Sequence, residues 1–269
     1  MFKRAIAGSF LVAAILVITA PPAGAVIFKT KRPGQYRPFA LTVGSGLEYE
    51  TDSEETQYGF PFLVEYGFTE RFKVSVEPSY IVVRKKDGDS ITGMGDLEAT
   101  VTYEFPTERR YRPGIALEGV VKFPTAGRGD LGTGEADYSV GAILSKELVP
   151  FDFDLNAVYT FVGSPPGVQL KNTFEASLAA EWHLTTMFDV EAEVVTSFGA
   201  GGRFHGQAGS LGSLANLGGA VQGQSESEGT LGFAEHLSDR FKLEEGMVLK
   251  SDGTWQAVAG WEFDFGEGR

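Results

Sequence analysis

The sequence predicts an all-β protein, namely a closed antiparallel transmembrane β-barrel of about 12 strands. Apolar and polar side chains alternate with a period of two along many segments of roughly ten residues, as in strands with two different faces. The composition of 21 phenylalanines, nine tyrosines and 35 glycines suits aromatic girdles and turns better than helices. Beyond the N-terminus, no run approaches the roughly 20 apolar residues of a spanning helix.

Residues 1–25 predict export. Two basic residues, Lys3 and Arg4, precede an apolar run, and a small-residue A-x-A sequence ends at Ala25. This order is typical of a secretory signal peptide. We therefore expect cleavage after Ala25 and localisation in a bacterial outer membrane. Because the chain has no cysteine, the stability of the exported protein must come from a source other than disulfides, such as a closed strand ladder.

Residues 26–39 form a basic tail that precedes the first strand pattern. It holds Lys29, Lys31, Arg32 and Arg37 and no acidic residue. Two placements are open: a mobile segment in the periplasm, or a partial plug that enters an acidic lumen. Because the tail lacks a strand pattern, we expect its removal to leave the barrel folded.

The barrel is predicted at 40–265, and 266–269 form a C-terminal extension. Its segments of alternating polarity give an even number of strands, as single-chain barrels require. In chain order they lie at 41–50, 57–67, 72–82, 97–105, 115–123, 138–144, 153–161, 174–184, 188–198, 231–237, 241–249 and 254–265. The last of these sets Trp255 and Trp261 on one face against Gln256 and Glu262 on the other.

The links between these strands differ in length. The Gly- and Asp-rich segment Lys85–Asp96 is predicted to be a loop. Short turns that mark a periplasmic rim alternate with mostly longer links at the outer rim; the turns lie near Thr69, Glu108, Pro150, Thr185 and Asp239, and the links near Asp87, Arg128, Pro166 and Gly212. The segment Gly199–Gly229 is either a mobile outer loop or a lid for a greasy ligand, since Leu211, Leu214 and Leu217 recur every third residue.

Two acidic residues depart from the pattern. Glu235 and Glu245 fall on the lipid-facing side of adjacent strands, where a carboxylate costs energy at mid-membrane and little near the rim. Either a β-bulge shifts the register there or the strands face a partner. We favour the bulge.

The lumen-facing side is predicted to be acidic. Its pore-lining candidates are Glu48, Glu65, Glu77, Glu98, Glu104, Glu118, Lys122, Glu181, Glu191, Glu193 and Glu262, with Asp96 and Asp137 at the rim. One interpretation is a hydrated wall whose charges specify the inner face. The other is a pore that favours cations, because rings of carboxylates set selectivity. The two interpretations are compatible.

Catalytic and cofactor sites are not predicted. His183, His205 and His236 lack metal-ligand spacing, so we expect no metal, and no dinucleotide motif sits in a strand-loop-helix setting. A membrane esterase or phospholipase is a minor alternative, but nothing marks one serine as a nucleophile. The net charge of −13 argues against a nucleic-acid partner.

Several short motifs in the middle of the chain resemble an outer-membrane family called the MetA-pathway of phenol degradation. They are Gly93-Met94-Gly95-Asp96-Leu97, Tyr103-Glu104-Phe105, Arg112-Pro113-Gly114-Ile115-Ala116, Lys122-Phe123-Pro124-Thr125, Gly132-Thr133-Gly134 with Asp137, and Ser145-Lys146. The resemblance implies a porin-like transporter for aromatic or other hydrophobic compounds. One departure is the chain end, where four residues follow Phe265, whereas such barrels commonly finish on the aromatic.

We therefore expect an outer-membrane channel for small solutes and not an enzyme. The alternative is a non-transporting structural or surface-interaction barrel. The expected partners are outer-membrane lipid, a small-molecule solute and the machinery that inserts barrels. We expect a monomer without cofactors.

Overall fold

The structure is a computed structural model that describes residues 29–32, 38–105, 108–129, 131–166, 170–199 and 226–265. The predicted signal peptide, the leucine-containing lid segment, His205 and the C-terminal extension lie outside the described residues. Within the described ranges, no helix has the length and apolar character needed to cross a membrane.

Fourteen strand segments form one sheet. They are β1 (Leu41–Thr51), β2 (Glu55–Gly67), β3 (Phe72–Glu77), β4 (Ser79–Lys85), β5 (Ser90–Met94), β6 (Leu97–Glu104), β7 (Gly114–Phe123), β8 (Asp137–Leu148), β9 (Phe151–Phe161), β10 (Thr173–His183), β11 (Phe188–Phe198), β12 (Glu226–Ser238), β13 (Phe241–Lys250) and β14 (Trp255–Asp264).

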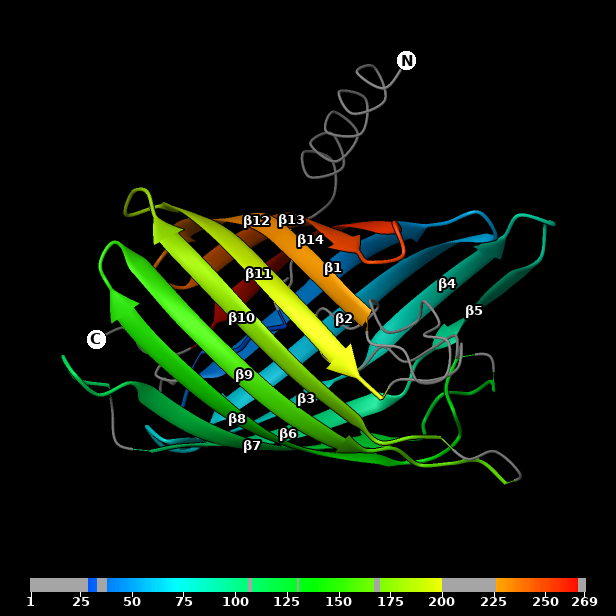
Figure 1. Ribbon diagram of the computed structural model, residues 1–269, viewed down its shortest axis with the longest axis horizontal. Helices are drawn as coiled ribbons and strands as arrows, with labels where there is room; N and C mark the ends of the chain where they lie inside the picture. The colour runs from blue at the N-terminus through cyan, green and yellow to red at the C-terminus, as the bar shows by residue number, and fades with distance from the viewer. Residues whose placement is uncertain are drawn as a thin grey trace, which may run out of the picture.

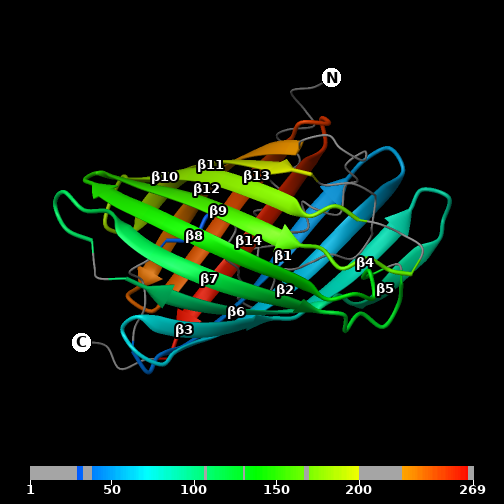
Figure 2. The same ribbon diagram turned by 60° about the horizontal axis from the view of Figure 1, so that its bottom comes forward.

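The sheet closes into a barrel because β1 pairs with both β2 and β14 (Figure 1). All pairings between neighbouring strands are antiparallel, and Figure 2 shows the tilted strands arranged in one closed ring. A closed ladder leaves no unpaired edge for lipid to contact. The predicted fold class is therefore confirmed.

The fourteen segments correspond to 12 strands because two of the strands are interrupted. β3 and β4 both pair with β2 and form one broken strand, while β5 and β6 form the next. Pro78 separates β3 from β4, since proline has no N–H to donate to the ladder. Across from this break, the Gly95 N–H donates to the Ser79 carbonyl oxygen over 3.0 Å.

The prediction of a loop at Lys85–Asp96 is wrong for half of that segment. Ser90–Met94 forms β5, which pairs with β4, so that the connection shrinks to the four residues 86–89. Its glycines and aspartates obscure the period of two. Ile91 nevertheless turns inward and packs beside Ile81 and Val83.

Apolar side chains of the barrel face outward and polar side chains face inward, which is the reverse of the arrangement in a soluble protein. Outward-facing Val194 and Leu249 are 56% and 60% exposed, whereas inward-facing Glu193 and Gln256 are 3% and 1% exposed. Aromatic rings pair across the outer surface, as in the stacked rings of Phe151 and Trp182 at 5.9 Å. This arrangement suits lipid outside and polar groups within.

One apolar cluster lies on the inner side. Ile81 and Val83 of β4 and Ile91 of β5 pack against Leu131, which is fully buried. Leu131 belongs to the link between β7 and β8, at the end of the barrel opposite the short turns. The link therefore folds back over the mouth instead of extending from the rim.

Glu235 and Glu245 both remain on the outer face. The register of β12 against β13 does shift, but the irregularity lies between His236 and Ser238, past Glu235, and turns neither carboxylate inward. Glu235 is exposed on the same face as Phe233. The expected effect of a bulge at these two positions is therefore wrong.

Candidate functional site

The inner wall carries the residues that the sequence assigns to it, all buried or half-buried. They are Glu48, Glu65, Glu77, Glu98, Glu104, Glu118, Lys122, Glu181, Glu191, Glu193 and Glu262, with Asp96 and Asp137 near one mouth. Several carboxylates are direct cross-strand neighbours; Glu77 lies opposite Glu98 and Glu181 opposite Glu191. Like charges this close repel, and cations in the lumen relieve this repulsion.

The described part of the basic tail lies inside this acidic lumen. The Lys29 Nζ is 2.5 Å from the Glu228 Oε1 on β12. The Thr30 N–H donates to the Glu193 Oε1 over 2.6 Å, and the Thr30 Oγ1 donates to the Ser177 Oγ over 2.7 Å. These bonds tie the tail to β10, β11 and β12.

Lys31 extends the contacts of the tail to the other side of the barrel. Its Nζ is 2.9 Å from the Glu118 Oε2 on β7. With its amide oriented to do so, the Asn156 side chain on β9 pairs with both the backbone N–H and the carbonyl of Lys31, at 2.5 and 3.0 Å. A buried backbone segment without a strand partner is thus satisfied by side chains of the wall.

Arg32 completes the docking of the tail near the rim that carries the short turns. Its guanidinium contacts Asp152 at 2.5 Å, Asp154 at 3.0 Å and Glu181 at 2.8 Å. Residues 29–32 therefore span the lumen and contact five strands, from β7 to β12. Of the two placements open from the sequence, these four residues adopt the plug.

The charge of the docked tail is stabilised by the wall. Burial alone would lower the pKa of the Lys29 ammonium, but the carboxylates of Glu228 and Glu175 outweigh burial and hold that pKa above its ordinary value. The same balance raises the pKa of Lys31, where Glu118 is the leading opposing charge. Both ammonium groups therefore stay protonated throughout the neutral range.

The rim candidates form a second buried network. The Lys122 Nζ lies 2.6 Å from the Asp137 Oδ2 and 3.6 Å from the Asp96 Oδ2, and the Ala126 N–H donates to the Asp96 Oδ1 over 2.9 Å. A Cβ at Gly132 would lie 2.7 Å from the Asp96 carboxylate oxygens, so the close approach requires glycine. This network holds the inward-folded link between β7 and β8.

Replacing Lys122 by Met is expected to destabilise the barrel by about 3 kcal/mol, because fully buried Asp96 loses its ion pair. Urea unfolding in detergent measures the change. Lys146→Met is the matched control, since Lys146 pairs with Glu108 at a more exposed turn and its loss should cost about 1 kcal/mol or less. Equal losses of stability in the two variants would contradict this account of the rim.

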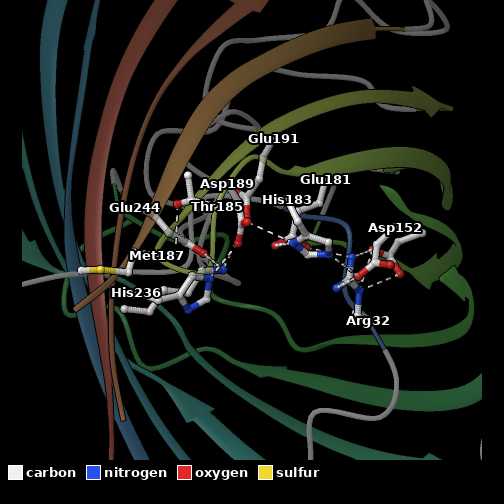
Figure 3. Close-up of polar contacts among 12 residues, drawn as sticks. Arg32, Asp152, Glu181, His183, Thr185, Met187, Asp189, Glu191, His236 and Glu244 are labelled. Carbon is white, nitrogen blue, oxygen red and sulfur yellow. Dashed lines mark hydrogen bonds and ion pairs between the residues drawn. The ribbon is translucent and has the colours of Figure 1, made fainter. Parts of the chain in front are cut away.

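Sequence reasoning missed a histidine–carboxylate cluster at the rim with short turns (Figure 3). The Asp189 carboxylate lies between two imidazoles, with its Oδ1 3.0 Å from the His183 Nδ1 and its Oδ2 2.8 Å from the His236 Nε2. The His183 Nε2 lies 3.1 Å from the Asp152 Oδ2, and the His183 Nδ1 lies 3.8 Å from the Glu181 Oε1. We refer to these five residues as the rim cluster.

Strand register brings the rim cluster together. Asp189 pairs directly with His183, and Glu181 pairs directly with Asp152, on three consecutive strands. His236 comes from the end of β12 at the same rim. Spacing along the chain does not reveal this set, but aligning inward-facing residues at the ends of predicted neighbouring strands would have shown most of it.

Comparisons with known proteins agree with this architecture. The family model described as the MetA-pathway of phenol degradation matches residues 29–226. The COG4313 outer membrane channel from Pseudomonas putida F1 is similar over 87% of this chain and 100% of its own, with a TM-score of 0.64 and 12% identity. The NanC porin matches 83% of this chain and 98% of its own, with a TM-score of 0.56 and 13% identity.

A third solved structure, the KdgM porin in complex with disordered oligogalacturonate, covers 83% of this chain and 99% of its own, with a TM-score of 0.52 and 10% identity. Among curated protein sequences, none matches the chain. At such low identities the structural likeness establishes the barrel fold, and these similar barrels are outer-membrane channels and porins.

Proposed function

Because the chain belongs to the MetA-pathway of phenol degradation family, we propose that it is an outer-membrane channel for small solutes, with aromatic or other hydrophobic compounds as the substrate class. The solute path is the charged lumen, and residues 29–32 lie across it in the structure described. Transport, rather than catalysis, is the activity that a lumen of this kind supports.

The observation that carries the proposal is the way in which the tail is held. Its contacts are ion pairs and hydrogen bonds to side chains of the wall, such as Lys29 to Glu228 and Thr30 to Glu193. The strand ladder closes through β1 and β14 without it. A segment held in this way can leave the lumen while the barrel stays intact, which is what a removable plug requires.

The substrate class is supported by the apolar cluster inside the outer mouth. Ile81, Val83 and Ile91 present apolar side chains to the lumen, and Leu131 covers them. An aromatic solute that displaces Leu131 would find an apolar surface there, next to the carboxylate-rich passage. The solute would then move past polar side chains toward the periplasm.

Swelling of proteoliposomes tests the channel and its substrate class together. We expect the barrel without residues 26–38 to admit phenylalanine faster than glutamine, although phenylalanine is the larger of these two zwitterions. Failure of both solutes to enter would contradict the channel. Faster entry of glutamine would contradict the aromatic preference and leave the channel standing.

A non-transporting structural barrel is the second candidate, and the docked tail favours it because the lumen is occupied. The two candidates separate once the tail is removed: a structural barrel still conducts nothing.

We further propose an outer-membrane location after removal of the signal peptide, insertion by the barrel-assembly machinery and a monomeric state. A size measurement in detergent that gives a dimer or trimer would contradict the last of these.

A further inference from the structure

His183 faces a carboxylate oxygen on each of its ring nitrogens. Its Nδ1 is 3.0 Å from the Asp189 Oδ1, and its Nε2 is 3.1 Å from the Asp152 Oδ2. A neutral imidazole has a single N–H, so it can donate to one of these oxygens and must present a lone pair to the other. Both contacts are favourable when the imidazole carries a second proton, or when a cation lies between the lone pair and the carboxylate that faces it.

Asp152 gives an independent sign of a cation-binding site. The residue as a whole is 7% exposed and its side chain is 10% exposed. Arg32 and His183 both approach its Oδ2, while its Oδ1 has no hydrogen-bond partner among the described residues. A buried carboxylate oxygen without a donor costs free energy that a bound cation would recover.

We propose that Asp152, Glu181 and His183 bind a divalent transition-metal ion of the zinc class, in competition with the Arg32 guanidinium. One ligand atom from each of these three residues lies within 4.8 Å of the other two, so small side-chain movements bring all three onto one ion. One imidazole with two carboxylates suits Zn²⁺, Ni²⁺ or Co²⁺ better than Ca²⁺ or Mg²⁺, which prefer oxygen ligands alone. This proposal departs from the metal-free interpretation of the sequence.

The surroundings of the site orient its histidine. When the His183 Nδ1–H donates to Asp189, the Nε2 lone pair points toward Asp152, which is the orientation that metal ligation requires. His236 holds the second oxygen of Asp189 and fixes that carboxylate in place. Carboxylate–histidine–metal arrangements of this kind strengthen metal binding by about 10- to 100-fold.

Arg32 and the metal exclude one another because they use the same two carboxylate groups. The guanidinium contacts Asp152 at 2.5 Å and Glu181 at 2.8 Å, so the cluster is free for a metal only when Arg32 withdraws. The apparent metal affinity is therefore the intrinsic affinity multiplied by the fraction of molecules in which Arg32 is undocked. By linkage, the metal favours the undocked tail to the same extent.

The test is the binding of Co²⁺ and Zn²⁺ by the mature protein, refolded in detergent without a polyhistidine tag. We expect a Co²⁺ absorption spectrum with a nitrogen ligand, and Zn²⁺ should displace the Co²⁺. Arg32→Ala should tighten binding by about tenfold or more, and His183→Ala should abolish it. His236→Ala should weaken binding by about tenfold or more while the spectrum is kept.

Two variants serve as matched controls. His205→Ala removes the third histidine of the chain, and Lys31→Ala removes a tail cation that pairs with Glu118. His205→Ala should bind metal as the unaltered protein does. Lys31→Ala weakens the docking of the tail but keeps Arg32, so it should bind metal no more weakly than the unaltered protein and less tightly than Arg32→Ala. Binding that survives His183→Ala, an Arg32→Ala affinity no tighter than that of the unaltered protein, or an absence of binding by Arg32→Ala would overturn the proposal. Gel mobility without heating checks that each variant is folded.

Discussion

Deleting residues 26–38 is expected to convert a barrel with rare or no openings into one with steady openings in planar bilayers. The deletion removes every contact that residues 29–32 make across the lumen, including the salt bridges of Lys29, Lys31 and Arg32. The barrel should stay folded, because β1 begins at Leu41 and the described residues of the deleted segment, 29–32 and 38, belong to no strand. Single-channel recording measures the effect.

The matched control for this deletion keeps the backbone of the tail and removes only its charges. Replacing Lys29, Lys31 and Arg32 by Gln should also raise the conductance, although less, because Thr30 can still bond to Glu193 and Ser177. A deleted barrel that is folded and does not conduct would contradict the channel. It would favour the structural barrel instead.

The tail-deleted pore is expected to prefer cations strongly. Carboxylates outnumber the lysines Lys73, Lys122, Lys242 and Lys250 along the inner wall, and the deletion removes the tail cations that offset them. Fixed charge in a narrow passage concentrates the opposite ion. The reversal potential in a salt gradient should therefore lie near the value for a pore that passes only cations. The reversal potential should move toward zero as the ionic strength rises, because the screening length falls from about 10 Å at 0.1 M to about 3 Å at 1 M.

The structure selects the residues for testing this preference. Glu193 is a poor choice because it holds Thr30, so its replacement changes both the charge and the docking of the tail. Neither Glu98 nor Glu191 forms a hydrogen bond with the described tail residues 29–32, and the double variant Glu98→Gln with Glu191→Gln in the deleted barrel should lower the preference for cations. A preference for anions, or one that neither salt nor these substitutions alter, would show that the carboxylates do not line the path.

The period of two accounts for how much of the barrel was predictable. Strands such as 97–105 and 188–198 carry enough alternation to fix both their existence and their inner face. The prediction of a loop at Lys85–Asp96 missed β5, because glycines and aspartates obscure its alternating pattern. Its pairing with β4 is apparent only in the structure. The prediction that a bulge turns Glu235 inward was wrong, because the irregularity between β12 and β13 lies between His236 and Ser238, past Glu235.

The candidate site was less predictable than the wall that surrounds it. The acidity of the lumen and the basic character of the tail are compositional, so the sequence allowed the plug as one of two placements. The bonding partners of the tail cannot be predicted from composition, because Thr30 bonds to Glu193, which lies 163 positions away in the sequence. The rim cluster likewise depends on the register that sets His183 beside Asp189 and Glu181 beside Asp152.

A reversible disulfide tests most directly whether docking of the tail closes the lumen. The chain has no cysteine, and the Thr30 Oγ1 and Ser177 Oγ lie 2.7 Å apart, so Thr30→Cys with Ser177→Cys places two thiols at a distance suited to a bond. The single-cysteine variants serve as controls. In the barrel whose Lys29, Lys31 and Arg32 are replaced by Gln, we predict that the oxidised double variant stays closed and that reduction restores openings at the level of the single variants. Equal conductance of the oxidised and reduced forms would contradict the account.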